Sequence, residues 1–293
     1  MWRKAWAASA IAILVTGTTS MVAVADREQA RGRVQFVTYN IHHGTGNDDC
    51  EPPPPQTPPL PDCGYNLARI AETIDSFDAD VVGLQEVDRF WARSALDDQP
   101  ALLGAALNMQ TCFGANLDHG PDSHSAMPHQ FGTAILSAYP IVDCRNTLLP
   151  RPIGEQRGLL EALIDVEGTL VRVFTTHLDT RLESRSEQIP ALIELIGMPP
   201  EPVILLGDFN ARPEAAEMAP LFDHFDDVWL LAGAGPGFTF RAAVLIEPDR
   251  RIDYIFSSRN DVDVESAFVK IDDETRIASD HYPVQTRVRF VQP

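Results

Sequence analysis

The sequence predicts a mixed α/β domain in which two β-sheets pack together and helices cover their outer faces. Two observations lead to this prediction. Apolar runs typical of strands recur along the chain of 293 residues, and segments with helical periodicity alternate with the earlier runs. Many strand segments follow one another without a helix between them, so part of the pairing must be antiparallel. This order fits two layered sheets better than a doubly wound parallel sheet.

The predicted strands are apolar runs or alternating segments bounded by polar and turn residues. In chain order they are VQFVTYNI (34–41), VVGLQEV (81–87), TAILSAYPI (133–141), GLLEALIDV (158–166), TLVRVFTTHL (169–178), VILLGDF (203–209), RIDYIFSS (251–258) and PVQTRVRF (283–290). The predicted helices place their apolar residues on one stripe. They lie in YNLARIAETIDSF (65–77), ALLGAALNM (101–109) and around EQIPALIELIG (187–197).

Residues 1–25 have the pattern of a signal peptide. Two basic residues precede an apolar run of about a dozen residues, and AVA then fits a small-residue cleavage site. The run is too short to span a bilayer. We therefore expect a secreted protein without a transmembrane segment, with a short segment at 26–33 and one domain over 34–293.

The chain is strongly acidic. It carries 23 Lys and Arg against 42 Asp and Glu, a formal net charge of −19, and two of the basic residues fall in the signal peptide. Non-specific nucleic-acid binding depends on Lys and Arg at phosphates, so this balance argues against a protein that grips long DNA. A bound divalent cation would reverse the field locally, so a nuclease is not excluded.

An even number of cysteines in an exported chain predicts two disulfides. Of the three pairings, we favour Cys50 with Cys63 and Cys112 with Cys144, because the first would close the loop at 51–62, which contains seven prolines. A zinc site is disfavoured, since no CxxC pair is present. We interpret the Pro-rich loop as a surface insertion, with a stiff flap beside the substrate as the functional alternative.

Polar side chains of a particular kind lie at or near the ends of the predicted strands. They are Asn40, Glu86, His177, Asp208, Asn210, Asp253, Asp280 and His281. Any one of them alone is better explained as a turn or a satisfied core group. Together they supply oxygen ligands, amides and imidazoles on apolar segments that a sheet core would hold rigidly. Metal-assisted hydrolysis of a phosphate ester requires this combination.

The same segments carry a family resemblance. The motifs YNIHHG, LQEVD, ILSAYPI, THLDT, GDFNARP, RIDYIF and SDHYPV, in this order from about Val34 to Phe290, resemble the endonuclease/exonuclease/phosphatase superfamily with its DNase I-like fold. EVDRFWARSALDDQ resembles the exported bacterial metal-dependent hydrolases of that group. The resemblance implies a four-layer α/β/β/α sandwich, two mixed sheets flanked by helices, and a phosphoesterase activity.

The resemblance also implies a cation site and a nucleophile. Glu86 would be the principal ligand of Mg²⁺, with Mn²⁺ or Ca²⁺ as alternatives, and Asn40 and Asp280 would lie near the ion. Asp208 would orient or deprotonate the attacking water, while Asn210 would donate to a non-bridging phosphate oxygen.

Two histidines would contact the phosphate. His281 would hydrogen-bond the scissile phosphate with its tautomer fixed by Asp253, and His177 would make a second contact. The role of His42 is left open, because some nucleases of the family carry an acidic residue there. Arg157 is interpreted as an internal ion-pair partner, with a phosphate neighbour as the alternative.

Two further segments have weaker signals. The loop with His119, His124 and His129 is interpreted as solvated. The segment after the second strand contains Arg93, Ser94, Asp98 and Gln99. It either lines the substrate pocket or is a solvated connection.

The expected partner is a phosphate ester: nucleic acid, a lipid headgroup or a small phosphate ester. No stable protein partner is implied. The competing function class is a binding domain that keeps the fold without the chemistry.

Overall fold

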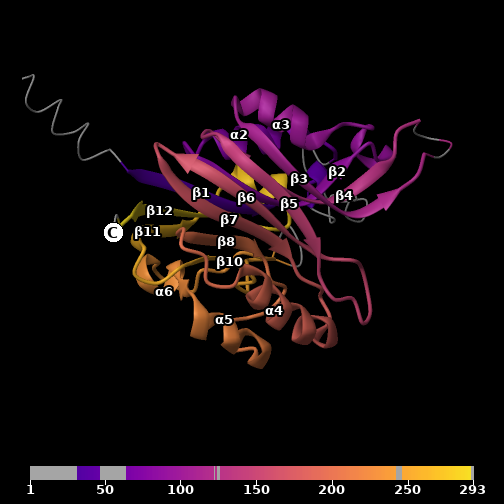
Figure 1. Ribbon diagram of the computed structural model, residues 1–293. Coiled ribbons are helices and arrows are strands. Elements are labelled where there is room, and N and C mark those ends of the chain that lie inside the picture. The colour runs from indigo at the N-terminus through magenta and orange to yellow at the C-terminus, as the bar shows by residue number, and fades with distance from the viewer. Residues whose placement is uncertain (1–31, 47–63, 122, 124–125, 242–245, 292–293) are drawn as a thin grey trace, which may run out of the picture. The chain divides into compact units, whose positions relative to one another are not determined.

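The computed structural model describes residues 32–46, 64–121, 123, 126–241 and 246–291. The predicted signal peptide, the Pro-rich loop and the Cys50–Cys63 pair lie outside these ranges. Residues 33–293 cluster as one unit, which is the one described below. Two six-stranded sheets lie face to face in it, with helices on both outer faces (Figure 1). The four-layer fold class predicted from the sequence is confirmed.

The first sheet has the strand order β11-β12-β1-β2-β4-β3. Its strands are β1 (Arg33–Asn40), β2 (Val81–Arg89), β3 (Gln110–His119), β4 (His129–Ser137), β11 (Val262–Val269) and β12 (Val284–Phe290). The central pair β1 and β2 is parallel, and the other neighbours are antiparallel. The carboxyl ends of β1 and β2 therefore meet at the same edge of the sheet.

The second sheet has the order β5-β6-β7-β8-β10-β9. Its strands are β5 (Ile141–Leu148), β6 (Gly158–Val166), β7 (Thr169–His177), β8 (Val203–Asp208), β9 (Asp226–Asp227) and β10 (Asp253–Ser257). Here β7 and β8 form the parallel pair, and the remaining neighbours are antiparallel. Each sheet thus contributes one pair of strands whose carboxyl ends lie together.

Helices cover the two outer faces. The helices are α2 (Leu67–Asp75), α3 (Gln99–Leu107), α4 (Leu182–Ile196), α5 (Ala219–His224), α6 (Val228–Ala232) and α7 (Asp273–Ala278), with short 3-10 turns η1 (His42–Gly44), η3 (Ala92–Ser94) and η4 (Ala216–Met218). Of these, α6 differs, because its Val228 belongs to the core between the sheets. The three predicted helices are present, although α4 begins five residues earlier than the predicted segment at 187. No helix among the described residues is long and apolar enough to cross a membrane.

Four strands were absent from the sequence prediction: β3, β5, β9 and β11. All four lie at sheet edges. The side chains of β5 and β11 are mostly exposed or half-buried, because an edge strand is covered on fewer sides than a central one. Such strands lack the apolar runs by which the central strands are recognised.

Three apolar cores hold the layers together. One lies between α2, α3 and the first sheet, one between the two sheets, and one between the second sheet and α4 and α5. The sheets come close at Gly83 of β2, where an added Cβ would lie 2.7 Å from Cδ1 of Leu206 in β8. Only a residue without a side chain fits this spacing.

A disulfide joins the two sheets at one edge. It links Cys112 of β3 to Cys144 of β5, so the predicted pairing of these two cysteines is confirmed. Their separation of 32 residues in sequence means that the bond closes a long loop of the unfolded chain. A loop of that size corresponds to about 3–4 kcal/mol of stabilisation in the chain-entropy account.

Candidate active site

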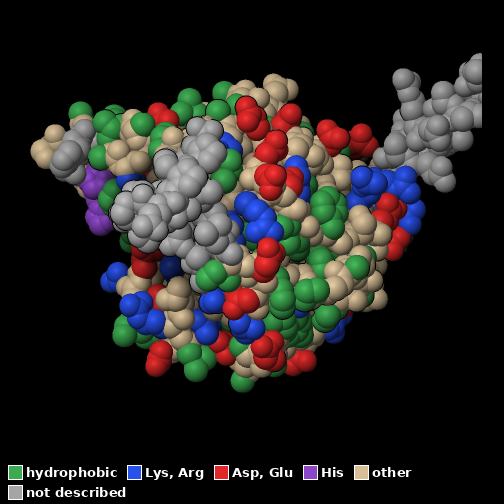
Figure 2. All heavy atoms as spheres, turned by 180° about the vertical axis from the view of Figure 1, so that it is seen from behind, with side chains coloured by type: hydrophobic (Ala, Val, Ile, Leu, Met, Phe, Trp, Pro, Cys, Tyr) green, Lys and Arg blue, Asp and Glu red, His purple; other side chains and the backbone are tan. Residues whose placement is uncertain are grey.

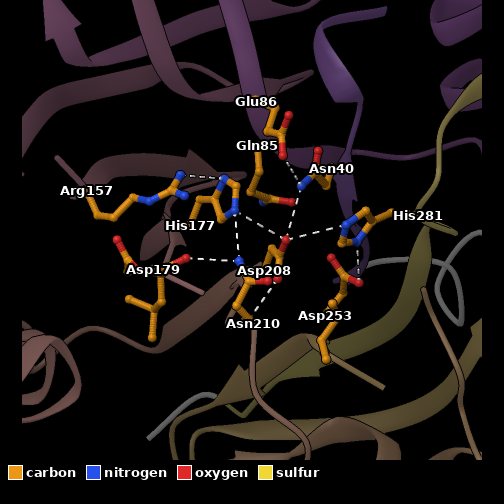
Figure 3. Close-up of polar contacts among 12 residues, drawn as sticks. Asn40, Gln85, Glu86, Arg157, His177, Asp179, Asp208, Asn210, Asp253 and His281 are labelled. Atoms are coloured by element: carbon orange, nitrogen blue, oxygen red, sulfur yellow. Dashed lines mark hydrogen bonds and ion pairs between the residues drawn. The ribbon is translucent and has the colours of Figure 1, made fainter. Parts of the chain in front are cut away.

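The candidate site lies at the end of the sandwich where both parallel strand pairs finish. Asn40 ends β1 and is paired with Gln85 of β2, and His177 ends β7 beside Asp208 at the end of β8. Asp253 opens β10 directly opposite Asp208. Side chains from the two sheets therefore face one another across a short distance (Figure 3). Strand ends of layered α/β proteins commonly carry ligands in this way.

Glu86 enters the site because β2 bulges there. The pairing with β4 shifts register between Leu84 and Val87, and Glu86 has a left-handed backbone with φ 57°. Gln85 meanwhile points between the sheets and donates to Thr175 Oγ1 at 2.9 Å. A bulge re-aims side chains out of the alternation of a regular strand. The sequence motif contained Glu86 but gave no sign of this distortion.

Asp208 is the centre of the contacts. It is 1% exposed, and its Oδ2 accepts from Nδ2 of Asn40 at 3.1 Å. The same oxygen lies 3.4 Å from Nε2 of His177 and 3.6 Å from Nε2 of His281. Burial, reinforced by the negative charge of Asp253, raises the pKa of Asp208 to about 7. A carboxyl group with that pKa is suited to exchange a proton with water near neutral pH.

Asp253 and His281 form a buried ion pair. Nδ1 of the imidazole lies 2.9 Å from Oδ2 of Asp253, which also accepts from Thr239 Oγ1 at 2.6 Å. Burial acts to lower the pKa of His281, but the charges of Asp253, Asp208 and Asp280 outweigh it and raise the pKa well above the usual value. The ring therefore carries two protons at neutral pH, with Nδ1–H on Asp253 and Nε2–H on the side of Asp208.

His177 has the opposite protonation. Burial, together with the positive charge of Arg157, holds its pKa well below the usual value. A guanidinium only donates, so the contact of 3.0 Å between Arg157 and Nδ1 places the proton of the neutral ring on Nε2, facing Asp208. The amide nitrogen of Asn210 lies 3.0 Å from that same Nε2 but donates to the carbonyl of Leu178 at 3.0 Å, so two N–H donors lie side by side. Arg157 also pairs with Glu155 at 2.9 Å, which confirms the interpretation of an internal ion-pair partner.

The structure brings some of the predicted metal ligands together and not others. Nδ2 of Asn40 donates to Oε1 of Glu86 at 3.1 Å. The carboxylate of Asp280 accepts from Ser279 Oγ at 3.3 Å. It belongs to neither of the two groups in which potential ligand atoms of described residues lie within 4.8 Å of one another. These groups are His42, His43 and Glu86, and Asp208, Asp253 and His281.

The residues around Glu86 fit a divalent cation. Burial acts to raise the pKa of Glu86, but the neighbouring His43, His177 and His42 outweigh it and hold the pKa well below the usual value, so the carboxylate is ionised. Nδ1 of His43 is buried and forms no hydrogen bond among the described residues. Carboxylate oxygens and imidazole nitrogens are ordinary ligands of divalent metals. His43 was not singled out from the sequence, although it stands beside His42 in the first motif.

The histidine loop differs from its prediction. His119 ends β3 and His129 begins β4, where they are directly paired. Their rings stack at 5.4 Å, and Trp91 packs edge-to-face on both at 5.7 and 4.6 Å. The interpretation as a loop was therefore wrong for these two residues, because the hairpin extends further, but His119 is exposed to solvent as expected and His129 is half-buried. His124 lies outside the described residues.

Several side chains of the segment after β2 belong to an internal hydrogen-bond network. Arg93 and Ser94 donate to the buried carboxylate of Asp88 at 2.7 and 2.9 Å. Asp98 caps the first turn of α3 through its side chain. Gln99 donates to the carbonyl of His43 at 2.7 Å, so this segment supports the backbone of the candidate metal site.

Comparisons with known proteins agree with this geometry. The chain matches the Endonuclease/Exonuclease/phosphatase family over residues 37–281. Protein cwh43 of Schizosaccharomyces pombe is 32% identical over 146 residues, which cover 47% of this chain and 14% of that protein. The chain thus spans a small part of the curated relative that it matches.

Solved structures share the fold. An endonuclease/exonuclease/phosphatase from Beutenbergia cavernae DSM 12333 superposes with a TM-score of 0.69 at 28% identity, over 89% of this chain and 72% of that one. The mannosyl-6-phosphatase Bt3783 of Bacteroides thetaiotaomicron VPI-5482 gives a TM-score of 0.63 at 20% identity, over 88% and 100%. The chain therefore belongs to the endonuclease/exonuclease/phosphatase family, enzymes that hydrolyse phosphate esters on the DNase I-like fold.

Proposed function

We propose that the protein is an exported, Mg²⁺-dependent phosphoesterase in which Asp208 activates the attacking water. One observation carries the proposal. The buried carboxyl group of Asp208 has its pKa raised to about 7 and lies between two histidines of opposite protonation, one neutral and one charged. A base, a fixed hydrogen-bond donor and a cationic donor then surround one small volume, as hydrolysis of a phosphate ester requires.

Each side chain has a separate task. Asp208 removes a proton from water as the water attacks phosphorus. His281, held by Asp253 at 2.9 Å, donates from Nε2 to a phosphoryl oxygen and places positive charge where negative charge develops. Asn210 and His177, which lie 3.0 Å apart, would hold a second oxygen of the phosphate.

Glu86 would hold the metal through its carboxylate, and Asn40 through its amide oxygen, which also accepts from the backbone N–H of His42 at 3.1 Å. A bound divalent cation supplies positive charge to the phosphoryl oxygens and lowers the pKa of a coordinated water. Asn40 donates to both Glu86 and Asp208 at 3.1 Å, so it ties the cation side of the site to the base. Asp280 remains a proposed neighbour of the ion through the segment that also carries His281.

The charge distribution favours a small phosphate ester or a lipid headgroup over long nucleic acid. The chain has a formal net charge of −19. Figure 2 shows one face on which Lys and Arg are interspersed with Asp and Glu rather than gathered in a stripe. Since affinity for a polyanion comes mostly from such a stripe, the net charge and this face support substrates recognised locally at the phosphate. Export is supported by the signal-peptide pattern of residues 1–25.

The proposal is tested with the mature protein, residues 26–293, supplied with a small phosphate monoester, sphingomyelin or phosphoinositide vesicles, and supercoiled plasmid. Release of phosphate or headgroup, or nicking of the plasmid, should require Mg²⁺ and vanish in EDTA and in His281→Ala. Hydrolysis of plasmid alone would reverse the substrate preference in favour of a nuclease. Metal binding with no hydrolysis of any substrate would favour a binding domain that has kept only the fold.

A further inference from the structure

We propose that His42 and His43 join Glu86 in a nitrogen-rich metal site that prefers borderline transition metals, of the Co²⁺ and Zn²⁺ type, to Mg²⁺. The inference goes beyond the proposed function, in which Mg²⁺ is the ion of catalysis, by naming the ions that the site binds most tightly, and it rests on that function for the role of Glu86. One ligand atom from each of the three residues lies within 4.8 Å of the others. That spacing lets a single ion contact all three.

His42 is oriented as a metal ligand through its second nitrogen. Its Nδ1 lies 2.6 Å from the carbonyl oxygen of Gly46. A carbonyl only accepts, so Nδ1 carries the proton and Nε2 carries the lone pair. Histidines bound to metals almost always hold their ring in this way, with the other N–H donated to a carbonyl or carboxylate.

His43 presents the second nitrogen. Its Nδ1 lies 3.4 Å from Oε2 of Glu86 and is buried without a hydrogen bond among the described residues. The ring packs edge-to-face on Phe131 at 6.4 Å and against His42 at 4.5 Å. A buried nitrogen that faces a carboxylate without a hydrogen bond is unfavourable unless another group binds it. A cation between the two would satisfy both.

The backbone at these three residues has a conformation that is unfavourable for residues with side chains. His42, His43 and Glu86 all have left-handed conformations, with φ 45°, 43° and 57°. Residues with side chains seldom adopt that region, and where they do at a site the surrounding structure must fix them. It does so here, because Gln99 donates to the carbonyl of His43 at 2.7 Å.

The other candidate group is less suited to a cation. In Asp208, Asp253 and His281 the imidazole is held between two carboxylates, at 2.9 and 3.6 Å, and both of its nitrogens face them as donors. Neither nitrogen of this imidazole is therefore available as a ligand, although Oδ1 of Asp253 is buried without a hydrogen bond among the described residues. Around Glu86, by contrast, two imidazole nitrogens and one carboxylate oxygen are directed at the same volume.

The donor set predicts the class of metal. Mg²⁺ strongly prefers oxygen ligands in a regular octahedron and keeps several waters. Imidazole nitrogen favours Zn²⁺, Co²⁺ and neighbouring transition metals. A site with two imidazoles and one carboxylate should therefore bind Co²⁺ and Zn²⁺ more tightly than a site made of Glu86 and Asn40 alone, while Mg²⁺ gains little from the added nitrogens.

The decisive experiment titrates the metal-free mature protein with Co²⁺ and follows the visible d–d absorption, with Mg²⁺ as competitor. The variants are His42→Asn and His43→Asn, because asparagine tolerates the left-handed backbone at both positions. His119→Asn is the matched control, since His119 lies in the β3–β4 hairpin and does not belong to the group with Glu86. Each of the two test variants should lose about 10–100-fold in Co²⁺ affinity, with a shifted spectrum. Mg²⁺ affinity should change little, and the control should behave as the wild type.

Unchanged Co²⁺ binding in both test variants, or equal losses for Co²⁺ and Mg²⁺, would overturn the inference. If a variant does not fold, X-ray absorption of the wild-type Zn²⁺ complex decides instead. Imidazole scattering is expected, and its absence refutes the site. The proposed function fails separately: tight Co²⁺ binding that depends on the histidines, with no hydrolysis of any phosphate ester, would leave the metal site in place and remove the phosphoesterase.

Discussion

The half of the site that the first sheet contributes differs in backbone conformation and hydrogen bonding from the half that the second sheet contributes. On the side of the first sheet, Glu86 and the histidines of η1 stand on left-handed backbone, and a buried imidazole nitrogen has no hydrogen bond among the described residues. On the side of the second sheet, Asp208, His177 and Asn210 are tied to one another and to Arg157 by short contacts. The first half is thus organised to receive a cation, and the second to keep each proton on a defined atom.

The largest effect is expected from a substitution of the general base, Asp208. Asp208→Asn keeps the size of the side chain but cannot take a proton, so kcat should fall by about 10²–10⁴-fold. The measurement is kcat on the best substrate of the panel, with the urea midpoint of unfolding as a check on the fold. A loss below about tenfold would move the role of base to another group, because general-base catalysis is worth more than that.

Removal of the charge behind His281 should have the next largest effect. Asp253→Asn leaves a hydrogen-bond partner but lowers the pKa of the imidazole, which is raised by that charge. We expect kcat to fall by about 10²–10³-fold. The alkaline limb of the pH–rate profile should move to lower pH, because His281 must stay protonated. A lower rate with an unmoved limb would show that Asp253 acts only through packing.

On the cation side, Glu86→Gln should weaken metal and spare the proton network. Loss of the carboxylate removes the one negative ligand of the group with His42 and His43. We expect metal affinity to fall by about 100-fold, the upper range for outer partners of a metal site, and isothermal titration checks it. High metal concentration should restore part of the rate, which it cannot do for Asp208→Asn. Equal failure of rescue in both variants would contradict the division into two halves.

The smallest effect concerns stability. The pKa of His177 is held well below its usual value in the folded protein. As pH falls below the unfolded value of about 6.5, the unfolded chain takes up a proton that the folded one does not, which costs about 1.4 kcal/mol of stability per pH unit. His177→Asn should flatten the decline in the free energy of unfolding between about pH 6 and pH 5 by that amount. Urea unfolding at the two pH values tests this, and equal slopes would refute it.

The sequence predicted the second half better than the first. The apolar run from Val203 to Leu206 and the polar residues after it identify a buried strand that ends in a turn, and pairing then places Asp208 opposite Asp253. Regular strands permit such inference, because successive side chains point to opposite faces, so the position of a residue in the sequence tells which face its side chain occupies. Glu86 could be named only from the family motif, since its orientation depends on a bulge that leaves no mark in hydrophobic periodicity.

The metal side also depends on contacts between segments far apart in sequence. His43 faces Glu86 from η1, which is held by Gln99 of α3 and by the backbone N–H of Asn66, and no local pattern records these contacts. The edge strands β5 and β11 escaped prediction for a related reason, because their exposed faces accept polar residues. A buried strand leaves a recognisable pattern of apolar residues in the sequence, whereas a turn that is held by contacts with distant residues leaves almost none.

The close approach of the sheets at Gly83 sets the spacing of the two halves of the site, although Gly83 has no reactive side chain. Gly83 lies three residues before Glu86 in β2 and faces Leu206, two residues before Asp208 in β8. The distance between the sheets at this point therefore sets the distance between the metal ligand Glu86 and the base Asp208. A single methyl group, as in Gly83→Ala, would wedge the layers apart and lengthen that span. Substitution at this buried position therefore changes the distance between the two halves of the site while the identity of every catalytic group is kept.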